Sequence, residues 1–122
     1  MAATMQDFVS VLFQSRTQAH TWHLATTFYS EHKALGGYYD EIVDLVDGLV
    51  ESYQGCYGRI SGYTTKPLVD WKEGQSATYF KSLYDYVQST RTGLDQATWV
   101  QNQIDEIAAL IAETMYQLTL KG

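Results

Sequence analysis

The sequence predicts an all-α fold, a four-helix bundle with one longer crossover connection, built as a single domain over residues 1–122. Two observations lead to this. Apolar residues recur at spacings of three and four in four separate segments. A segment without helical period, residues 58–74, contains three glycines and the single proline and divides these segments into two pairs. Two helix pairs joined by one longer connection form a four-helix bundle with a crossover.

We expect the first helix from about Thr4 to about Trp22 and the second from about Thr27 to about Gln54, with residues 24–27 as the turn. Thr26 or Thr27 is the expected N-cap of the second helix. The core-facing residues of the first helix are predicted to be Phe8, Val9, Leu12 and Phe13, and those of the second Leu35, Ile42, Val46, Leu49 and Tyr53.

Gly36 and Gly37 lie inside the second helix, where each glycine costs about 1 kcal/mol relative to alanine. Close approach of another backbone or of an aromatic ring would explain such a cost. The alternative is a break here that gives two shorter helices.

The third helix is predicted to begin at the N-cap Ser76 and the fourth to span residues 95–119. Asp95 is the expected N-cap of the fourth helix, and Gly93 is expected to end the preceding segment in a left-handed conformation. The predicted apolar stripes are Tyr79, Phe80, Leu83, Tyr84 and Val87, followed by Val100, Ile104, Ile107, Ile111, Met115 and Leu118.

The charge pattern excludes some functions. Fourteen acidic residues against eight basic ones give a net charge of −6, and the basic residues are scattered. Binding to nucleic acid needs grouped Lys and Arg, so a nucleic-acid partner is not expected. No segment is apolar enough to span a bilayer, and the expected location is the cytoplasm. Motifs for phosphate loops, nucleophile elbows and dinucleotide binding are missing.

All three histidines lie in the stretch "AHTWHLATTFYSEH", residues 19–32. At about 100° per residue, His20 and His23 share an apolar sector of the first helix, while His32 borders an acidic stripe on the second. That stripe contains Asp40, Asp44, Asp47 and Glu51. Imidazole and carboxylate donors together suit Fe(II), and also Mn(II) or Zn(II). The alternative interpretation is a solvated acidic face beside hydrogen-bonded core histidines.

The intervals between these residues resemble those of the mini-ferritins, the Dps-like branch of the ferritin-like superfamily. His20 is followed twelve residues later by His32, and Asp47 and Glu51 follow as the "DGLVE" motif. An aromatic eight residues after the first histidine is present as Phe28. The resemblance covers roughly residues 5–55 well, and short mini-ferritin-like proteins of tailed phages are similar in the same run.

The resemblance implies a ferritin-like bundle and an iron centre shared between subunits. His20 and His32 of one chain would then meet Asp47 and Glu51 of its two-fold partner, and these four are the expected catalytic and metal-binding residues. The implied assembly is a homo-oligomer with a two-fold dimer interface, and typical members extend it to a shell of twelve subunits.

The sequence also departs from the family pattern. A further acidic ligand of the family stands four residues after the second histidine, where this chain has Gly36. Asp40, Asp44 or His23 is the candidate replacement, and His23 is alternatively a hydrogen-bonding partner of the ligands. The basic N-terminal tail that some members use on DNA is missing.

The resemblance implies a ferroxidase that oxidises Fe(II) to Fe(III) with O2 or H2O2, for iron detoxification or storage, in the cytoplasm or a phage-infected host. Trp22, Tyr29 and Tyr39 are the aromatic residues expected closest to the centre. The alternative is a non-catalytic structural or interaction protein that retains the bundle.

Overall fold

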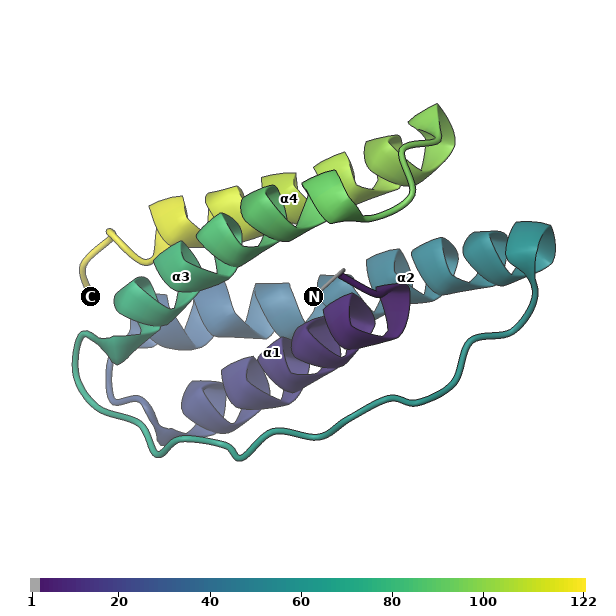
Figure 1. The fold of residues 1–122 in the computed structure, drawn as a ribbon. Helices are drawn as coiled ribbons and strands as arrows, with labels where there is room; N and C mark the ends of the chain where they lie inside the picture. The colour runs from purple at the N-terminus through teal and green to yellow at the C-terminus, as the bar shows by residue number, and fades with distance from the viewer. Residues whose placement is uncertain (1–2) are drawn as a thin grey trace.

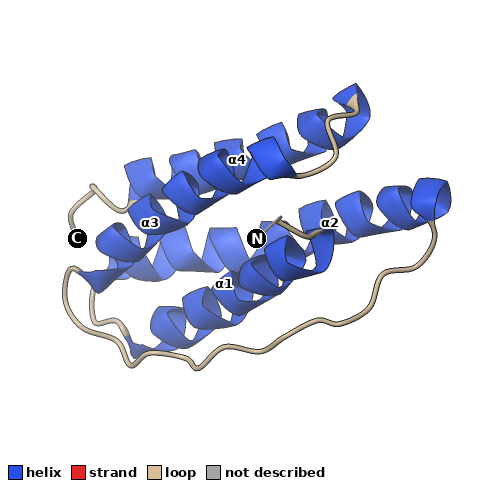
Figure 2. Cartoon of the chain, in the orientation of Figure 1, coloured by secondary structure: helices blue, strands red, loops and turns tan. Residues whose placement is uncertain are grey.

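The computed structural model describes residues 3–122 and consists of four long helices. These are α1 (Met5–Ala25), α2 (Tyr29–Tyr57), α3 (Gln75–Thr90) and α4 (Thr98–Gln117), with a short 3-10 turn, η1 (Arg91–Gly93), after α3. Only helices and loops occur in this described part of the chain (Figure 2). The prediction of an all-α four-helix bundle is confirmed.

The helices form two antiparallel pairs, α1 with α2 and α3 with α4 (Figure 1). The segment 58–74 leaves the far end of α2, runs the length of the bundle beside α1 and returns to the end where α2 began. Consequently α2 and α3 run in the same direction, and each helix is antiparallel to its packed neighbours, which include α4 against α2.

The core follows the predicted stripes closely. Its largest fully buried side chains come from all four helices and include Phe8, Trp22, Tyr38, Ile42, Phe80, Ile104 and Ile111. Phe13 is an exception: it was expected in the core but is 42% exposed, and its ring lies 5.7 Å from that of Tyr63 in the crossover segment. The ring therefore packs beneath the loop and not between helices.

The crossover segment is extended but is fixed to α1 by polar contacts. The Gln18 amide bonds both backbone groups of Val69, at 2.8 and 3.0 Å, and the Trp22 indole N–H donates to the Val69 carbonyl at 2.7 Å. Nearer the start of α1, the Thr64 N–H donates to the Ser10 hydroxyl at 2.9 Å. These side chains satisfy loop backbone groups that have no partner in a sheet or helix.

Several predicted helix ends are wrong by a few residues. Helix α1 continues to Ala25, and α2 starts at Tyr29 with Phe28 as its N-cap residue, although the Thr26 hydroxyl still accepts the Phe28 N–H at 3.1 Å. Helix α3 has Gly74, and not Ser76, at its N-cap.

At the start of α4 the N-cap residue is Ala97, because Asp95 bonds the Ala97 N–H at 2.7 Å and thereby forms a turn before the helix. Gly93 does not have the expected left-handed conformation, since it closes the 3-10 turn.

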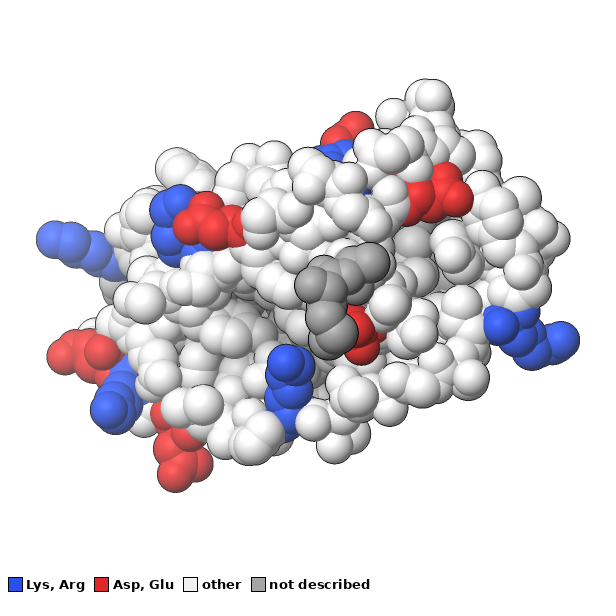
Figure 3. Space-filling view, in the orientation of Figure 1, with Lys and Arg blue, Asp and Glu red and all other residues white. Residues whose placement is uncertain are grey.

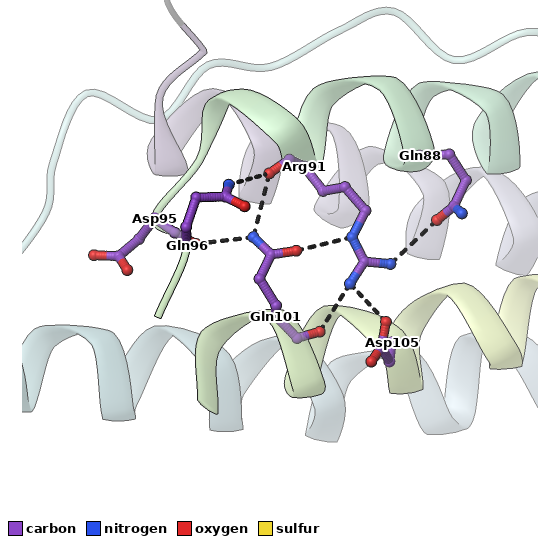
Figure 4. Close-up of polar contacts among 6 residues, drawn as sticks. All are labelled: Gln88, Arg91, Asp95, Gln96, Gln101 and Asp105. Atoms are coloured by element: carbon purple, nitrogen blue, oxygen red, sulfur yellow. Dashed lines mark hydrogen bonds and ion pairs between the residues drawn. The ribbon is translucent and has the colours of Figure 1, made fainter. Parts of the chain in front are cut away.

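The turn between α3 and α4 is held by Arg91 (Figure 4). Its guanidinium donates to the side chain and carbonyl of Gln101, each at 2.9 Å, and to Asp105 at 2.6 Å. The Gln101 amide in turn donates to the carbonyls of Arg91 and Asp95. Arg91 and Gln101 thus tie the end of α3 to the first turns of α4.

Candidate metal centre

The three histidines gather where the end of α1 meets the beginning of α2. The rings of His23 and His32 stack with centroids 3.8 Å apart and planes 16° apart, and the His20 ring lies 6.3 Å from that of His23. All three residues are half-buried. His23 therefore contacts His32 and also neighbours His20.

His23 and His32 bond each other's backbone. Nδ1 of His23 lies 2.6 Å from the carbonyl oxygen of His32, and Nδ1 of His32 lies 2.8 Å from the carbonyl oxygen of His23. A carbonyl oxygen only accepts, so both Nδ1 atoms carry a proton. In the neutral imidazoles Nε2 then has a free lone pair, the state in which histidine binds a metal ion.

The His23 ring lies directly against Gly36. A Cβ atom at position 36 would be 3.0 Å from Cε1 and 3.1 Å from Nδ1 of that ring. The expected close approach of an aromatic ring to the glycine pair is thus observed at Gly36, and α2 continues through both glycines without the alternative break. At Gly37 a Cβ would meet nothing within 4 Å.

Two tyrosines lie beside the imidazoles. The Tyr39 ring stacks on His20 with centroids 4.2 Å apart, and the Tyr29 ring lies 6.4 Å from that of His32. Trp22, the third aromatic residue expected close to the centre, is instead buried and bonded to the crossover segment. Phe28, the aromatic residue eight positions after His20, has its ring centroid 6.4 Å from that of Trp71 and is 40% exposed.

The carboxylates of the predicted stripe are all exposed, on the side of α2 opposite its core face. Asp40, Asp44, Asp47 and Glu51 belong to this stripe. Two ion pairs occur within residues 3–122, Lys81 with Asp85 and Arg91 with Asp105, and neither involves the stripe. Asp47 and Glu51 are one helical turn apart, a spacing at which two carboxylates can reach the same ion.

The histidines and the carboxylates of one chain do not meet. His32 and Asp47 are fifteen residues apart on a continuous helix, which corresponds to about 22 Å. Within residues 3–122 of a single chain, no three His, Cys, Asp or Glu side chains form a group that could hold a metal ion. A centre made of His20, His32, Asp47 and Glu51 therefore needs ligands from two copies.

Glu31 lies at the centre of a hydrogen-bond network that the sequence did not predict. Its carboxylate accepts hydrogen bonds from the hydroxyls of Thr26 and Ser76 and from the Trp71 indole at 3.1 Å. The position of Glu31 in the first turn of α2 was the one local signal, because acids are favoured there. The donors come from three other segments, so the sequence did not reveal the network.

Two surface properties bear on possible partners. On the face drawn in Figure 3, Lys and Arg side chains are scattered and form no patch. No helix within the described residues 3–122 is long and apolar enough to cross a membrane.

Residues 23–118 match a family of unknown function, DUF5856. The chain belongs to this family. The matched region contains His23, His32, Asp47 and Glu51, whereas His20 precedes it. The chain is also similar to an uncharacterised 14.6 kDa protein from the mobD–ri intergenic region of Enterobacteria phage T4. The two are 26% identical over 127 residues, which cover 94% of this chain and 88% of the relative. No solved structure matches the chain.

Proposed function

We propose that this chain is a ferritin-like protein that binds Fe(II) between two copies and oxidises it to Fe(III) with O2 or H2O2. His20 and His32 of one copy and Asp47 and Glu51 of its two-fold mate would hold the iron. The oxidised iron would be detoxified or stored in the cytoplasm of a phage-infected host. Mn(II) and Zn(II) are alternative ions for the same donors.

The observation that carries this proposal is the state of His32. Its Nδ1–H bonds a carbonyl, which leaves the Nε2 lone pair free to bind a metal ion, and within the described residues of one chain the histidines join no metal-binding group. The exposed Asp47 and Glu51 are free of ion pairs in the described structure and are available to a second copy. The antiparallel bundle with a long crossover between α2 and α3 further supports a ferritin-like fold.

The donor set fits the reaction. Ionised carboxylates offset the charge of Fe(II), neutral imidazoles supply nitrogen donors, and hard carboxylate oxygens favour the Fe(III) product. Each Fe(II) gives one electron to the oxidant, so a pair of irons reduces O2 to H2O2, or H2O2 to water, with uptake of two protons. Asp44 and His23 remain predicted as additional contributors to the site. A homodimer is the minimum assembly, and a shell of twelve subunits is the larger assembly implied by the resemblance.

The test is anaerobic Fe(II) loading followed by exposure to air, with the absorbance of Fe(III) as the readout. Wild type should oxidise iron faster than a protein-free control, and His32→Ala and Asp47→Ala should both abolish that excess. Glu113→Ala, which removes an exposed acid from α4, is the matched control and should behave as wild type. Equal rates for wild type and the protein-free control would refute the ferroxidase.

Complementation tests whether the ligands come from two chains. In a two-fold dimer of His32→Ala with Asp47→Ala, one of the two sites has all its ligands, so random mixing should restore about a quarter of wild-type activity. If the site is formed within one chain, mixing restores nothing.

A second candidate is a non-catalytic structural or interaction protein that retains the bundle. The reciprocal bonds between His23 and His32 favour it, because they give both histidines a role in joining α1 to α2. This candidate predicts full stability without metal and no acceleration of iron oxidation.

A further inference from the structure

We propose that His23 is a positioning residue for His32: its ring fixes the orientation and protonation of the His32 imidazole, and Gly36 makes room for that ring. The metal-binding part of this inference rests on the proposed function. The orientation of His32 can be measured without any metal.

The backbone carbonyls of His23 and His32 hold the two imidazole rings. His23 lies in the last turn of α1, where carbonyl groups have no partner within the helix. The His32 Nδ1–H satisfies the His23 carbonyl at 2.8 Å, and the His23 Nδ1–H returns a bond of 2.6 Å to the His32 carbonyl. The pair therefore closes a ring of two hydrogen bonds between the helix ends, which removes the rotational freedom of both imidazoles.

The His23 ring also stacks on the His32 ring. With ring centroids 3.8 Å apart and planes 16° apart, the His23 ring covers one face of the His32 ring. His32 is thus held by the ring face and by Nδ1, and Nε2 is the ring atom left for a ligand. Histidines that bind metals commonly donate their other N–H to a carbonyl in this way.

Gly36 provides the space that the His23 ring occupies. Any side chain at this position would place Cβ 3.0 Å from Cε1 of His23, so the ring would have to move. Gly36 also stands where the resemblance places an acidic ligand. The His23 ring occupies that space, and its Nδ1 bonds the His32 carbonyl. The ring of His23 thus fills the place of the acid and contacts His32 there.

Three variants separate positioning from ligation. The amide nitrogen of His23→Asn can reach the position of Nδ1 and bond the His32 carbonyl, whereas His23→Gln reaches the position of Nε2. His23→Ala has neither group. If His23 positions His32, His23→Asn should preserve the orientation of His32 and the metal affinity, and His23→Gln should not. If His23 is itself a metal ligand, the reverse is expected.

The first readout is histidine nitrogen NMR of the metal-free protein near neutral pH. Wild type should show His32 protonated on Nδ1, with slow exchange of that proton with water. Exchange should accelerate in His23→Ala and in Gly36→Ala and stay slow in His23→Asn and in the control Gly37→Ala. An Nε2–H tautomer for His32, or equal exchange in wild type and His23→Ala, would overturn the inference.

The second readout is Co(II) affinity, followed by its visible absorption. We expect His23→Ala and His23→Gln to bind Co(II) about 10- to 100-fold more weakly and His23→Asn to stay within about threefold of wild type. If His23→Asn loses Co(II) affinity and His23→Gln retains it, His23 is a ligand and the inference is wrong. If wild type itself binds no Co(II), the proposed function fails, and the NMR result alone decides the inference.

Discussion

The phenol oxygen of Tyr38 lies 2.7 Å from the hydroxyl oxygen of Ser15, and both residues are buried in the core between α1 and α2. The Ser15 hydroxyl donates its proton to the Leu12 carbonyl at 2.6 Å, so Tyr38 is the donor to Ser15. The two partners therefore differ in what their removal leaves behind.

Ser15→Ala should destabilise the protein more than Tyr38→Phe. Removal of the Ser15 hydroxyl leaves the buried Tyr38 O–H unpaired, which costs about 2 kcal/mol, whereas Tyr38→Phe leaves Ser15 bonded to Leu12 and costs about 1 kcal/mol. Urea unfolding of both variants measures the free energies. The opposite order would show that Tyr38 has another partner in solution.

Stability should fall as pH rises above 10. Burial raises the pKa of Tyr38 and of Tyr79 well above the ordinary value of 10.0. The folded state keeps these protons while the unfolded chain loses them, so their contribution is complete below pH 10 and declines as pH increases further. Each tyrosine lowers the free energy of unfolding by up to about 1.4 kcal/mol per pH unit in this range.

Tyr38→Phe tests this assignment. Because it removes one titrating phenol, it should make the free energy of unfolding fall less steeply with pH. Urea unfolding at several pH values between about 9 and 11 gives the slope. Tyr116→Phe, which removes an exposed phenol, is the control. An unchanged slope in Tyr38→Phe would mean that Tyr38 ionises in the folded state.

Glu31→Gln should cost about 1 to 2 kcal/mol, because the carboxylate accepts from Ser76, Thr26 and Trp71 and an amide nitrogen cannot. Hydrogen exchange should also increase at the start of α3. Glu41→Gln changes an exposed acid of the same helix and should stay within about 0.5 kcal/mol of wild type. Equal effects of the two variants would contradict the network.

The two glycines of α2 should respond differently to alanine. Gly37→Ala should stabilise by about 0.8–1 kcal/mol, because its Cβ meets nothing and helix propensity improves. Gly36→Ala should lose this gain, because its Cβ displaces the His23 ring. In a His23→Ala background the gain should return, which thermal and urea unfolding in a double-mutant cycle would measure. Additive effects would exclude the contact between His23 and Gly36.

The sequence predicted the helical stripes well because burial follows a period of 3.6 residues. Ile104, Ile107 and Ile111 are fully buried as expected, and the crossover covers the predicted residues 58–74. It also indicated that a backbone or an aromatic ring would approach the glycine pair, and the ring of His23 does so at Gly36. The ends of the helices were less predictable, because Asp95 bonds the N–H of Ala97, the residue just before α4, and Arg91 joins α3 to α4 through Gln101.

The sequence by itself determined the four amphipathic helices and the spacing of His20, His32, Asp47 and Glu51, since both follow from local periodicity. Only the tertiary structure decided that His23 stacks on His32, that its ring lies on Gly36 and that Glu31 collects donors from three segments. These contacts depend on the angle and distance at which α1, α2 and the crossover pack. Side-chain packing across the whole bundle sets that geometry, and no single helix encodes it.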